Sequence, residues 1–219
     1  MKSEQLEGYD GDTEADEGVL GTLAVIMNLY NRESRGHVER IRRYSKLLLD
    51  AVAERYPEYE LNDERIHKII CAAAVQDIGE IAIPDHIILK PGRLDEYELE
   101  IMKQHTIKGC EIVESMAGYM TDQELYQYCY DICRSHHERY DGNGYPDGLM
   151  GEEIPLAAQV ISLTEMYDML TTPHVYIREH SHYEAVQMIL RGECGAFSPK
   201  LLSCFQQIED ELEKSGTSE

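Results

Sequence analysis

The strongest constraint on the fold is a succession of apolar patterns with the period of an α-helix. In the first of these segments, Leu23, Ile26, Met27 and Tyr30 fall on one face at helical spacing. No segment shows the sustained alternation with a period of two that a half-buried β-strand requires, and the sequence has no internal repeat. The sequence therefore predicts an all-α fold, a helical bundle of about seven to eight helices.

Start and stop signals place the boundaries of the later helices. The second helix is predicted over about 36–55, because Pro57 prevents its continuation. Further helices are expected behind Asn62, behind Asp95 with Glu98, behind Thr121 with Glu124, after Pro155, near Ser181, and at Ser198 with Pro199 in the first helical position.

Two long connections rich in Gly and Pro interrupt this series, at 79–93 and at 141–155. Long ordered loops in a helical domain often carry function. Each of the two follows directly on a group of possible metal ligands, so the loops direct attention to those groups.

The possible ligands are imidazole and carboxylate side chains on several helices. They are Glu33 and His37, four residues apart; Gln76 and Asp77; His105; His136 and His137; and Glu165 and Asp168, three residues apart. Such groups can build a di- or trinuclear site for Fe, Mn or Zn in a bundle, where cations polarise a phosphoryl oxygen and activate water. Taken singly, each has a structural explanation, such as a helix-stabilising pair, a solvated face or a boundary histidine. Spacing alone only suggests a metal cluster.

The charge of the chain excludes two classes of partner. Acidic residues outnumber basic ones 42 to 20, a formal net charge of −22. Such a chain lacks the basic surface that general nucleic-acid binding or docking on an anionic membrane requires. The longest apolar stretch, residues 19–30, is shorter than a membrane span, and the first residues lack the basic character of a signal peptide. We expect a cytoplasmic protein.

Charge and composition also indicate where the folded domain begins and ends. Residues 1–18 hold seven acids and one lysine and are predicted to be a disordered tail, followed by one domain over 19–213 and a disordered end over 214–219. The six cysteines are expected to be reduced and mostly buried. Cys129 and Cys133 have one-turn spacing, which is less typical of a structural zinc site than of two core thiols.

The sequence motifs in these segments indicate a family more specifically than the ligand spacing does. The run from His136 to Leu149, followed by Gly151 and by 154–156, strongly resembles the HD-GYP family, a branch of the HD-domain metal-dependent phosphohydrolases that cleaves cyclic di-GMP. The segment 77–94 matches the loop after the family's His-Asp pair. The resemblance covers about residues 20–205 and implies an HD-domain-like bundle with two ligand-bearing loops.

The resemblance also implies a site. It implies metal ligands at Glu33, His37, Asp77, His105, His136, His137 and Glu165, with Gln76 and Asp77 in the catalytic pair. It implies substrate contacts from Lys90, Gly144, Tyr145, Pro146, Asp168 and Arg178. The implied cofactor is a divalent transition metal, Fe or Mn before Zn, with incomplete occupancy possible, and no organic cofactor is expected.

Four departures from the family bear on activity. Gln76 stands where the family has the His of its pair, and a neutral amide oxygen is a weak ligand for a transition metal. Glu80 stands in place of a lysine, which reverses a charge that would face a phosphate. Glu165 replaces the first Asp of Asp-x-x-Asp, and residues 174–176 replace Arg-Pro-Tyr, with Arg178 as a basic residue nearby.

These departures favour a degenerate HD-GYP-like domain with weak or no hydrolysis, acting as a binding or signalling module with a partial metal site. The alternative is an active metal-dependent phosphohydrolase on cyclic di-GMP or on another phosphate ester or nucleotide. The expected ligand is a cyclic dinucleotide or other phosphate ester. A protein partner and a homodimer through the first helix are also expected.

Overall fold

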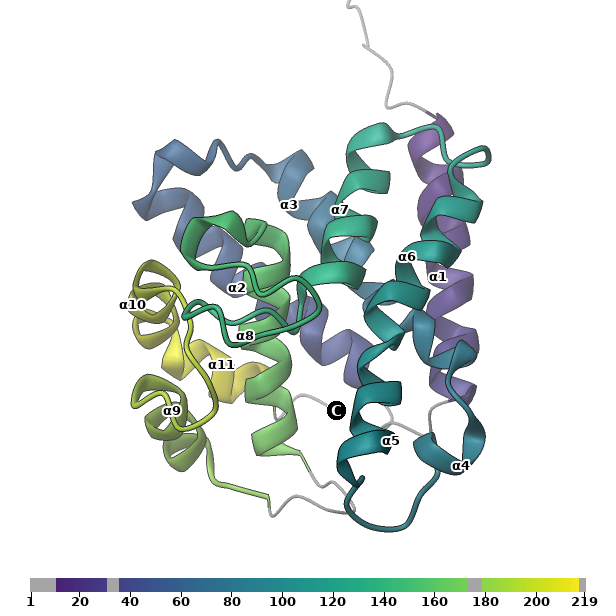
Figure 1. The fold of residues 1–219 in the computed structure, drawn as a ribbon. Coiled ribbons are helices and arrows are strands. Elements are labelled where there is room, and N and C mark those ends of the chain that lie inside the picture. The colour runs from purple at the N-terminus through teal and green to yellow at the C-terminus, as the bar shows by residue number, and fades with distance from the viewer. Residues whose placement is uncertain (1–10, 31–35, 173–178, 217–219) are drawn as a thin grey trace, which may run out of the picture.

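The computed structural model describes residues 11–30, 36–172 and 179–216, and within the first helix the side chains of 15–27. These residues form a bundle of α-helices (Figure 1). Within the described ranges the only β-type pairing is an isolated bridge between Asp141 and Met150. The predicted all-α fold is confirmed.

The helices are α1 (Gly11–Tyr30), α2 (His37–Arg55), α3 (Asp63–Ala72), α4 (Asp85–Ile88), α5 (Glu96–Lys103), α6 (His105–Met116), α7 (Gln123–Ser135), α8 (Leu156–Thr171), α9 (His182–Leu190), α10 (Pro199–Gln207) and α11 (Glu209–Gly216). This exceeds the predicted seven to eight for three reasons. The loop 79–93 contains a short helix of its own, the segment behind Asp95 divides at Gln104 into α5 and α6, and the segment behind Ser198 divides at Ile208 into α10 and α11.

Most of the predicted helix starts are confirmed by the hydrogen bonds of their first turns. Asn62 accepts the backbone N–H of Arg65, and Asp95 and Ser181 form capping boxes. The start of α7 was predicted one residue too early. Asp122 caps it by accepting the N–H groups of Glu124 and Leu125, whereas the hydroxyl of the preceding threonine is engaged elsewhere.

Helices α2 and α8 form the centre of the bundle. Helix α8 is buried around most of its circumference, which explains its mostly apolar sequence. Tyr44 of α2 and Tyr167 of α8 meet edge to face, with ring centroids 5.0 Å apart. Helices α9, α10 and α11 lie on one side of this pair, and α1, α6 and α7 lie on the other (Figure 1).

The prediction of a disordered tail over 1–18 is wrong for its second half. Helix α1 begins at Gly11, and Asp16 is buried, with only 3% of its surface exposed. Its carboxylate accepts the backbone N–H groups of Thr121 and Asp122, each at 2.8 Å, and the Thr121 hydroxyl at 3.2 Å. At the other end, α11 continues to Gly216, beyond the predicted boundary at 213.

The cysteines are free thiols, as expected. Five are buried, and Cys194 is half-buried. Cys129 and Cys133 lie in the core, and the Cys133 thiol donates to the carbonyl oxygen of Val75 at 2.9 Å. Among the described residues, no helix combines the length and the apolar character needed to cross a bilayer.

Candidate metal centre

Three helix ends bring four possible metal ligands together. Asp77 lies in the turn beyond α3, His105 is the first residue of α6, and His136 and His137 follow the end of α7. The Asp77 Oδ1 atom lies 3.5 Å from His105 Nε2 and 3.3 Å from His136 Nε2. One ligand atom from each of the four residues lies within 4.8 Å of all the others. We call this group the metal centre.

Two of the imidazoles are oriented by backbone carbonyl groups three and four residues before them in the chain. The Nδ1 atoms of His105 and His136 donate to the carbonyl oxygens of Met102 and Ile132, each at 2.7 Å. A carbonyl oxygen can only accept, so these contacts hold the proton on Nδ1. The Nε2 atoms face Asp77, where His136 Nε2–H donates to the carboxylate, and a metal ion would take the place of that proton when it binds.

The electrostatics of the centre favour an anionic carboxylate among mostly neutral rings. Burial and the charge of His136 hold the pKa of His137 well below its ordinary value, and burial lowers the pKa of His105. Burial alone would raise the pKa of Asp77, but the hydrogen bond from His136 and the nearby imidazole charges lower it. Three imidazoles and one carboxylate in these states form a donor set that fits a divalent transition metal.

A close backbone contact sets the distance between Asp77 and His105. The 3-10 turn Ile78–Ala82 packs against α6, with Gly79 at the contact. A Cβ atom at Gly79 would lie 1.9 Å from the carbonyl oxygen of His105 and 2.4 Å from the nitrogen of Gly109. Only glycine permits this approach.

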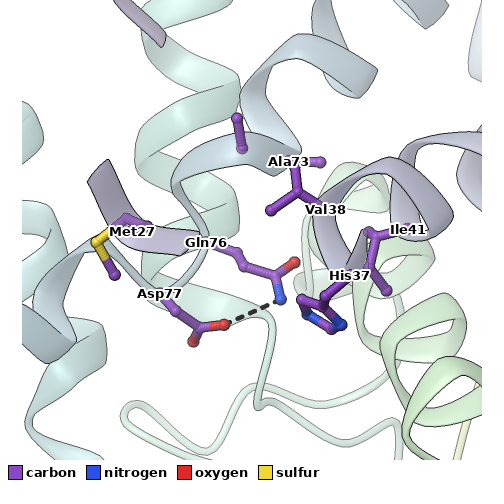
Figure 2. Close-up of a pocket in the computed structure, with 8 residues that line it drawn as sticks. Met27, His37, Val38, Ile41, Ala73, Gln76 and Asp77 are labelled. Atoms are coloured by element: carbon purple, nitrogen blue, oxygen red, sulfur yellow. Dashed lines mark hydrogen bonds between the residues drawn. The ribbon is translucent and has the colours of Figure 1, made fainter. Parts of the chain in front are cut away.

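Gln76 lies beside the centre and faces His37 across a small cavity (Figure 2). The cavity has a volume of about 20 Å³ and is lined by Met27, His37, Val38, Ile41, Ala73, Ala74, Gln76 and Asp77. The Gln76 Nε2 atom donates to Asp77 Oδ2 at 3.0 Å. The Gln76 Oε1 atom is buried and has no hydrogen-bond partner among the described residues.

His37 is held by a buried carboxylate. Its Nδ1 atom lies 2.7 Å from Oδ2 of Asp168, and the guanidinium of Arg40 binds both oxygens of the same carboxylate. Asp168 is fully buried, and His37 and Arg40 occupy its two oxygens. The substrate contact expected from Asp168 stays a prediction. Sequence reasoning missed Arg40, although its position three residues after His37 places both on one helix face.

The Gly-rich loop places Tyr145 against the metal centre. The Tyr145 ring stacks on His137, with centroids 4.8 Å apart and planes 24° apart. Gly144 allows this placement, because a Cβ there would lie 2.3 Å from the backbone nitrogen of Arg139. The bond from Tyr145 to Pro146 is cis.

Glu138 holds the same loop and was not recognised from the sequence. Its side chain is buried and accepts the backbone N–H groups of Asp147 at 2.7 Å, Gly148 at 3.1 Å and Leu149 at 3.1 Å. The available signal was an acidic residue directly before a Gly-rich loop, whose N–H groups need acceptors.

The remaining predicted residues are placed as follows. Lys90 forms an ion pair with Glu98 of α5. Glu165 lies close enough for its charge to favour the protonated form of His136, but it is not one of the four clustered ligands. Glu33 and Arg178 lie outside the described residues.

Comparison with known proteins agrees with this arrangement. A family model described as an HD domain matches residues 24–200. A probable cyclic di-GMP phosphodiesterase from Vibrio cholerae is 35% identical over 194 residues, which are 86% of this chain and 43% of that protein. The chain spans about half the length, or less, of the curated relatives it matches.

Two solved structures share the fold at 16% sequence identity. A cyclic GMP-AMP specific phosphodiesterase of Vibrio cholerae has a TM-score of 0.60 over 92% of this chain and 53% of that one. An HDGYP protein from Bdellovibrio bacteriovorus has a TM-score of 0.57 over 94% of this chain and 75% of that one.

Proposed function

The chain belongs to the HD-domain family, and from this premise we propose that it is a degenerate HD-GYP-like domain that binds one divalent transition-metal ion at the metal centre. It binds a cyclic dinucleotide or another phosphate ester with weak or no hydrolysis, and it acts as a signalling module. The relatives described above act on cyclic dinucleotides by name, which supports the choice of ligand class.

The observation that carries this proposal is the hydrogen bond from Gln76 to Asp77. A carboxylate that bridges two metal ions commonly offers one oxygen to each. Here the amide group of Gln76 donates to one oxygen of Asp77, while the other oxygen faces His105 and His136. A second ion would have to displace the amide N–H, and it would gain only a neutral oxygen in exchange.

The charges around the centre support weak hydrolysis. The Glu80 charge lies close enough to favour the protonated form of Tyr145, so it adds negative potential beside the centre. Lys90 and Lys103 are each paired with a glutamate, Glu98 and Glu100 respectively. Phosphoryl transfer depends on positioned positive charge around the phosphoryl oxygens. The two lysine–glutamate pairs reduce the positive charge available there.

The metal ion itself would supply Lewis-acid chemistry at a phosphoryl oxygen when bound. The chain's own groups would then position the ligand. Asp77, His105, His136 and His137 hold the ion, and Tyr145 closes one side of the centre through its stack on His137.

Metal content measured with single-site reversions tests the proposal. Elemental analysis of protein loaded anaerobically with Mn²⁺ should give about one ion per chain, and about two in Gln76→His. Gln76→His combined with Glu80→Lys should gain cyclic di-GMP hydrolysis. The matched control is Gln159→His, because Gln159 is also a buried glutamine whose Oε1 atom has no partner among the described residues. Two ions in the parent, together with turnover of cyclic di-GMP, would refute the proposal.

Two bound ions together with turnover of cyclic di-GMP would favour the alternative function, an active phosphohydrolase. The observation supporting it is the completeness of the four-ligand group, with the charge of Glu165 nearby. Assays on cyclic di-GMP, 3′3′-cGAMP and a simple phosphodiester would then identify the substrate.

A homodimer through α1, a protein partner and a cytoplasmic location remain predictions. The exposed apolar side chains of Val19, Val25 and Ile26 on α1 support the dimer. Light scattering on the parent and on a Val25→Glu variant would test it, since a dimer through this face should dissociate in the variant.

A further inference from the structure

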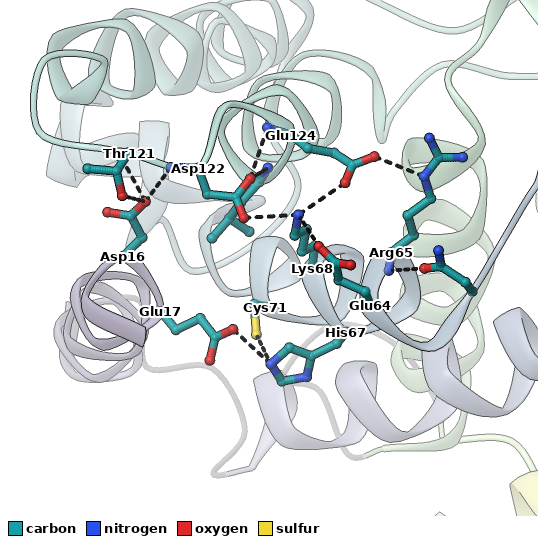
Figure 3. Close-up of polar contacts among 12 residues, drawn as sticks. Asp16, Glu17, Glu64, Arg65, His67, Lys68, Cys71, Thr121, Asp122 and Glu124 are labelled. Carbon is teal, nitrogen blue, oxygen red and sulfur yellow. Dashed lines mark hydrogen bonds and ion pairs between the residues drawn. The ribbon is translucent and has the colours of Figure 1, made fainter. Parts of the chain in front are cut away.

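A second group of metal-ligating side chains lies where α1 packs against α3, outside the metal centre (Figure 3). His67 and Cys71 are four residues apart on α3 and share one face of that helix. Glu17 approaches them from α1. Its Oε1 atom lies 2.8 Å from His67 Nε2, and Cys71 Sγ lies 3.7 Å from the same nitrogen.

The spacing of these atoms resembles a tetrahedral zinc site. With Zn–S near 2.3 Å and Zn–N near 2.0–2.1 Å, tetrahedral angles place neighbouring N and S atoms about 3.6 Å apart. The observed distance from His67 Nε2 to Cys71 Sγ is 3.7 Å, so this pair needs no rearrangement. The same geometry places N and O atoms about 3.4 Å apart. The Glu17 carboxylate would therefore withdraw by about half an ångström, which a partly exposed, flexible side chain allows.

We propose that Glu17, His67 and Cys71 form a second metal site for a borderline divalent cation of the Zn²⁺ type. Thiolate and imidazole together select Zn²⁺ over Mg²⁺, Ca²⁺ and Mn²⁺. Three protein ligands leave one coordination position for water, and the His67 side chain, 48% exposed, gives the ion access from solvent.

Metal binding at this site changes the protonation of two groups. Without metal, the Nε2–H group of His67 donates to Glu17; when the ion binds Nε2, the ring takes the tautomer with its proton on Nδ1. Burial, with a contribution from the Glu17 charge and opposed by Arg42, raises the pKa of Cys71 to about 11. The thiol is therefore protonated at neutral pH, and binding releases its proton to solvent and leaves the thiolate paired with the cation.

The site would fasten α1 to the body of the domain. Asp16, the neighbour of Glu17, already accepts backbone N–H groups at the start of α7. Further along α1, Met27 lines the cavity shared by Gln76 and His37. An ion at Glu17 would therefore stabilise the helix that forms one wall beside the metal centre.

Cobalt substitution tests this proposal with a signal specific to sulfur ligation. The full chain is titrated with Co²⁺, and near-ultraviolet sulfur-to-cobalt charge transfer is recorded. The band should saturate by two equivalents of Co²⁺, one for this site and one for the metal centre, and decrease when Zn²⁺ is added. It should be absent in Cys71→Ser, and the affinity should fall at least tenfold in His67→Gln and Glu17→Gln. Cys194→Ser, which removes a half-buried thiol elsewhere, should leave the band unchanged.

Two further variants separate this site from the metal centre and from simple unfolding. Asp77→Asn should retain the band, since the clustered ligands of the metal centre include no thiol. Circular dichroism checks the fold of each variant. If Cys71→Ser fails to fold, Glu17→Gln still tests the site, because it changes only a partly exposed side chain. No band in the parent, a band that persists in Cys71→Ser, or unchanged affinity in Glu17→Gln and His67→Gln would overturn the proposal.

Discussion

Gly79 lies so close to the carbonyl oxygen of His105 that a Cβ atom at this glycine would be 1.9 Å from that oxygen. The contact brings the turn that carries Asp77 against the helix that begins with His105. The separation between these two metal ligands therefore depends on the absence of one methyl group.

Gly79→Ala should damage both the fold and the metal centre. The added methyl group must push the turn away from α6, and overpacking of this kind costs about 3 kcal/mol. Displacement of Asp77 should weaken Mn²⁺ binding by roughly tenfold or more. Urea unfolding and metal titration measure the two effects. Gly118→Ala is the control, because a Cβ there meets no atom within 4 Å. Equal behaviour of the two variants would contradict the role assigned to Gly79.

Asp168→Asn should be strongly destabilising. Its carboxylate is fully buried between His37 and Arg40, and the Arg40 side chain is only 12% exposed. Removing one partner of a buried ion pair takes away the main buried counter-charge of the other, which costs about 3–5 kcal/mol. The matched control is Asp50→Asn, whose carboxylate pairs with Lys46 at the surface and should contribute about 0.5 kcal/mol or less. Comparable free energies of unfolding in urea would refute this expectation.

Glu138→Ala should loosen the Gly-rich loop. The change removes the acceptor of three backbone N–H groups, at Asp147, Gly148 and Leu149. We expect a loss of about 3 kcal/mol in stability, because unsatisfied buried donors cost about 1–3 kcal/mol each and some will bind water. Hydrogen exchange at these three amides should accelerate. Glu153→Ala, which removes an exposed acceptor of the Met150 N–H, should leave their exchange slow, and equal exchange in both variants would contradict the idea.

Acid should reduce the stability contributed by Asp122. Burial alone would raise the pKa of this carboxyl, but the backbone N–H groups it accepts and the ammonium of Lys68 hold it below its ordinary value of 3.8. A carboxyl with a lowered pKa in the folded state stabilises fully above its ordinary pKa, and this contribution is lost as the pH falls through the folded value.

The corresponding variant is Asp122→Asn, which keeps a capping oxygen but loses the charge beside Lys68. We expect it to be about 1–2 kcal/mol less stable than the parent at pH 7. The difference should be equal at pH 5 and should narrow at pH 3. Urea unfolding at the three pH values measures it, and Asp50→Asn should show little difference at each. A gap that widened in acid would reverse the sign argued here.

Much of the fold could be predicted because its signals are local. Asn62, Asp95 and Ser181 each cap a helix through a group three residues away, so a short stretch of sequence contains both partners. Among the predicted ligands, Asp77, His105, His136 and His137 do come together in space. The resemblance of the Gly-rich loop to the HD-GYP family identified these residues as metal ligands, which their spacing alone only suggested.

The remainder depends on partners far apart in the chain. Asp16 reads as part of an acidic tail because its acceptor role requires Thr121, more than a hundred residues away. Asp168 reads as a substrate contact because composition cannot show that Arg40 and His37 occupy its oxygens. The division between α5 and α6 has no Gly or Pro to mark it, so local propensity predicted one continuous helix.

The backbone contacts of His105 and His136 have a consequence for how the domain responds to metal. Because each ring is fixed through Nδ1 by a backbone carbonyl three or four residues earlier, an arriving ion finds two ligands already in place and orders little of the chain. Loaded and empty forms should then have nearly the same shape. Binding at this site would then change the charge of a chain of net charge −22 more than it changes its shape.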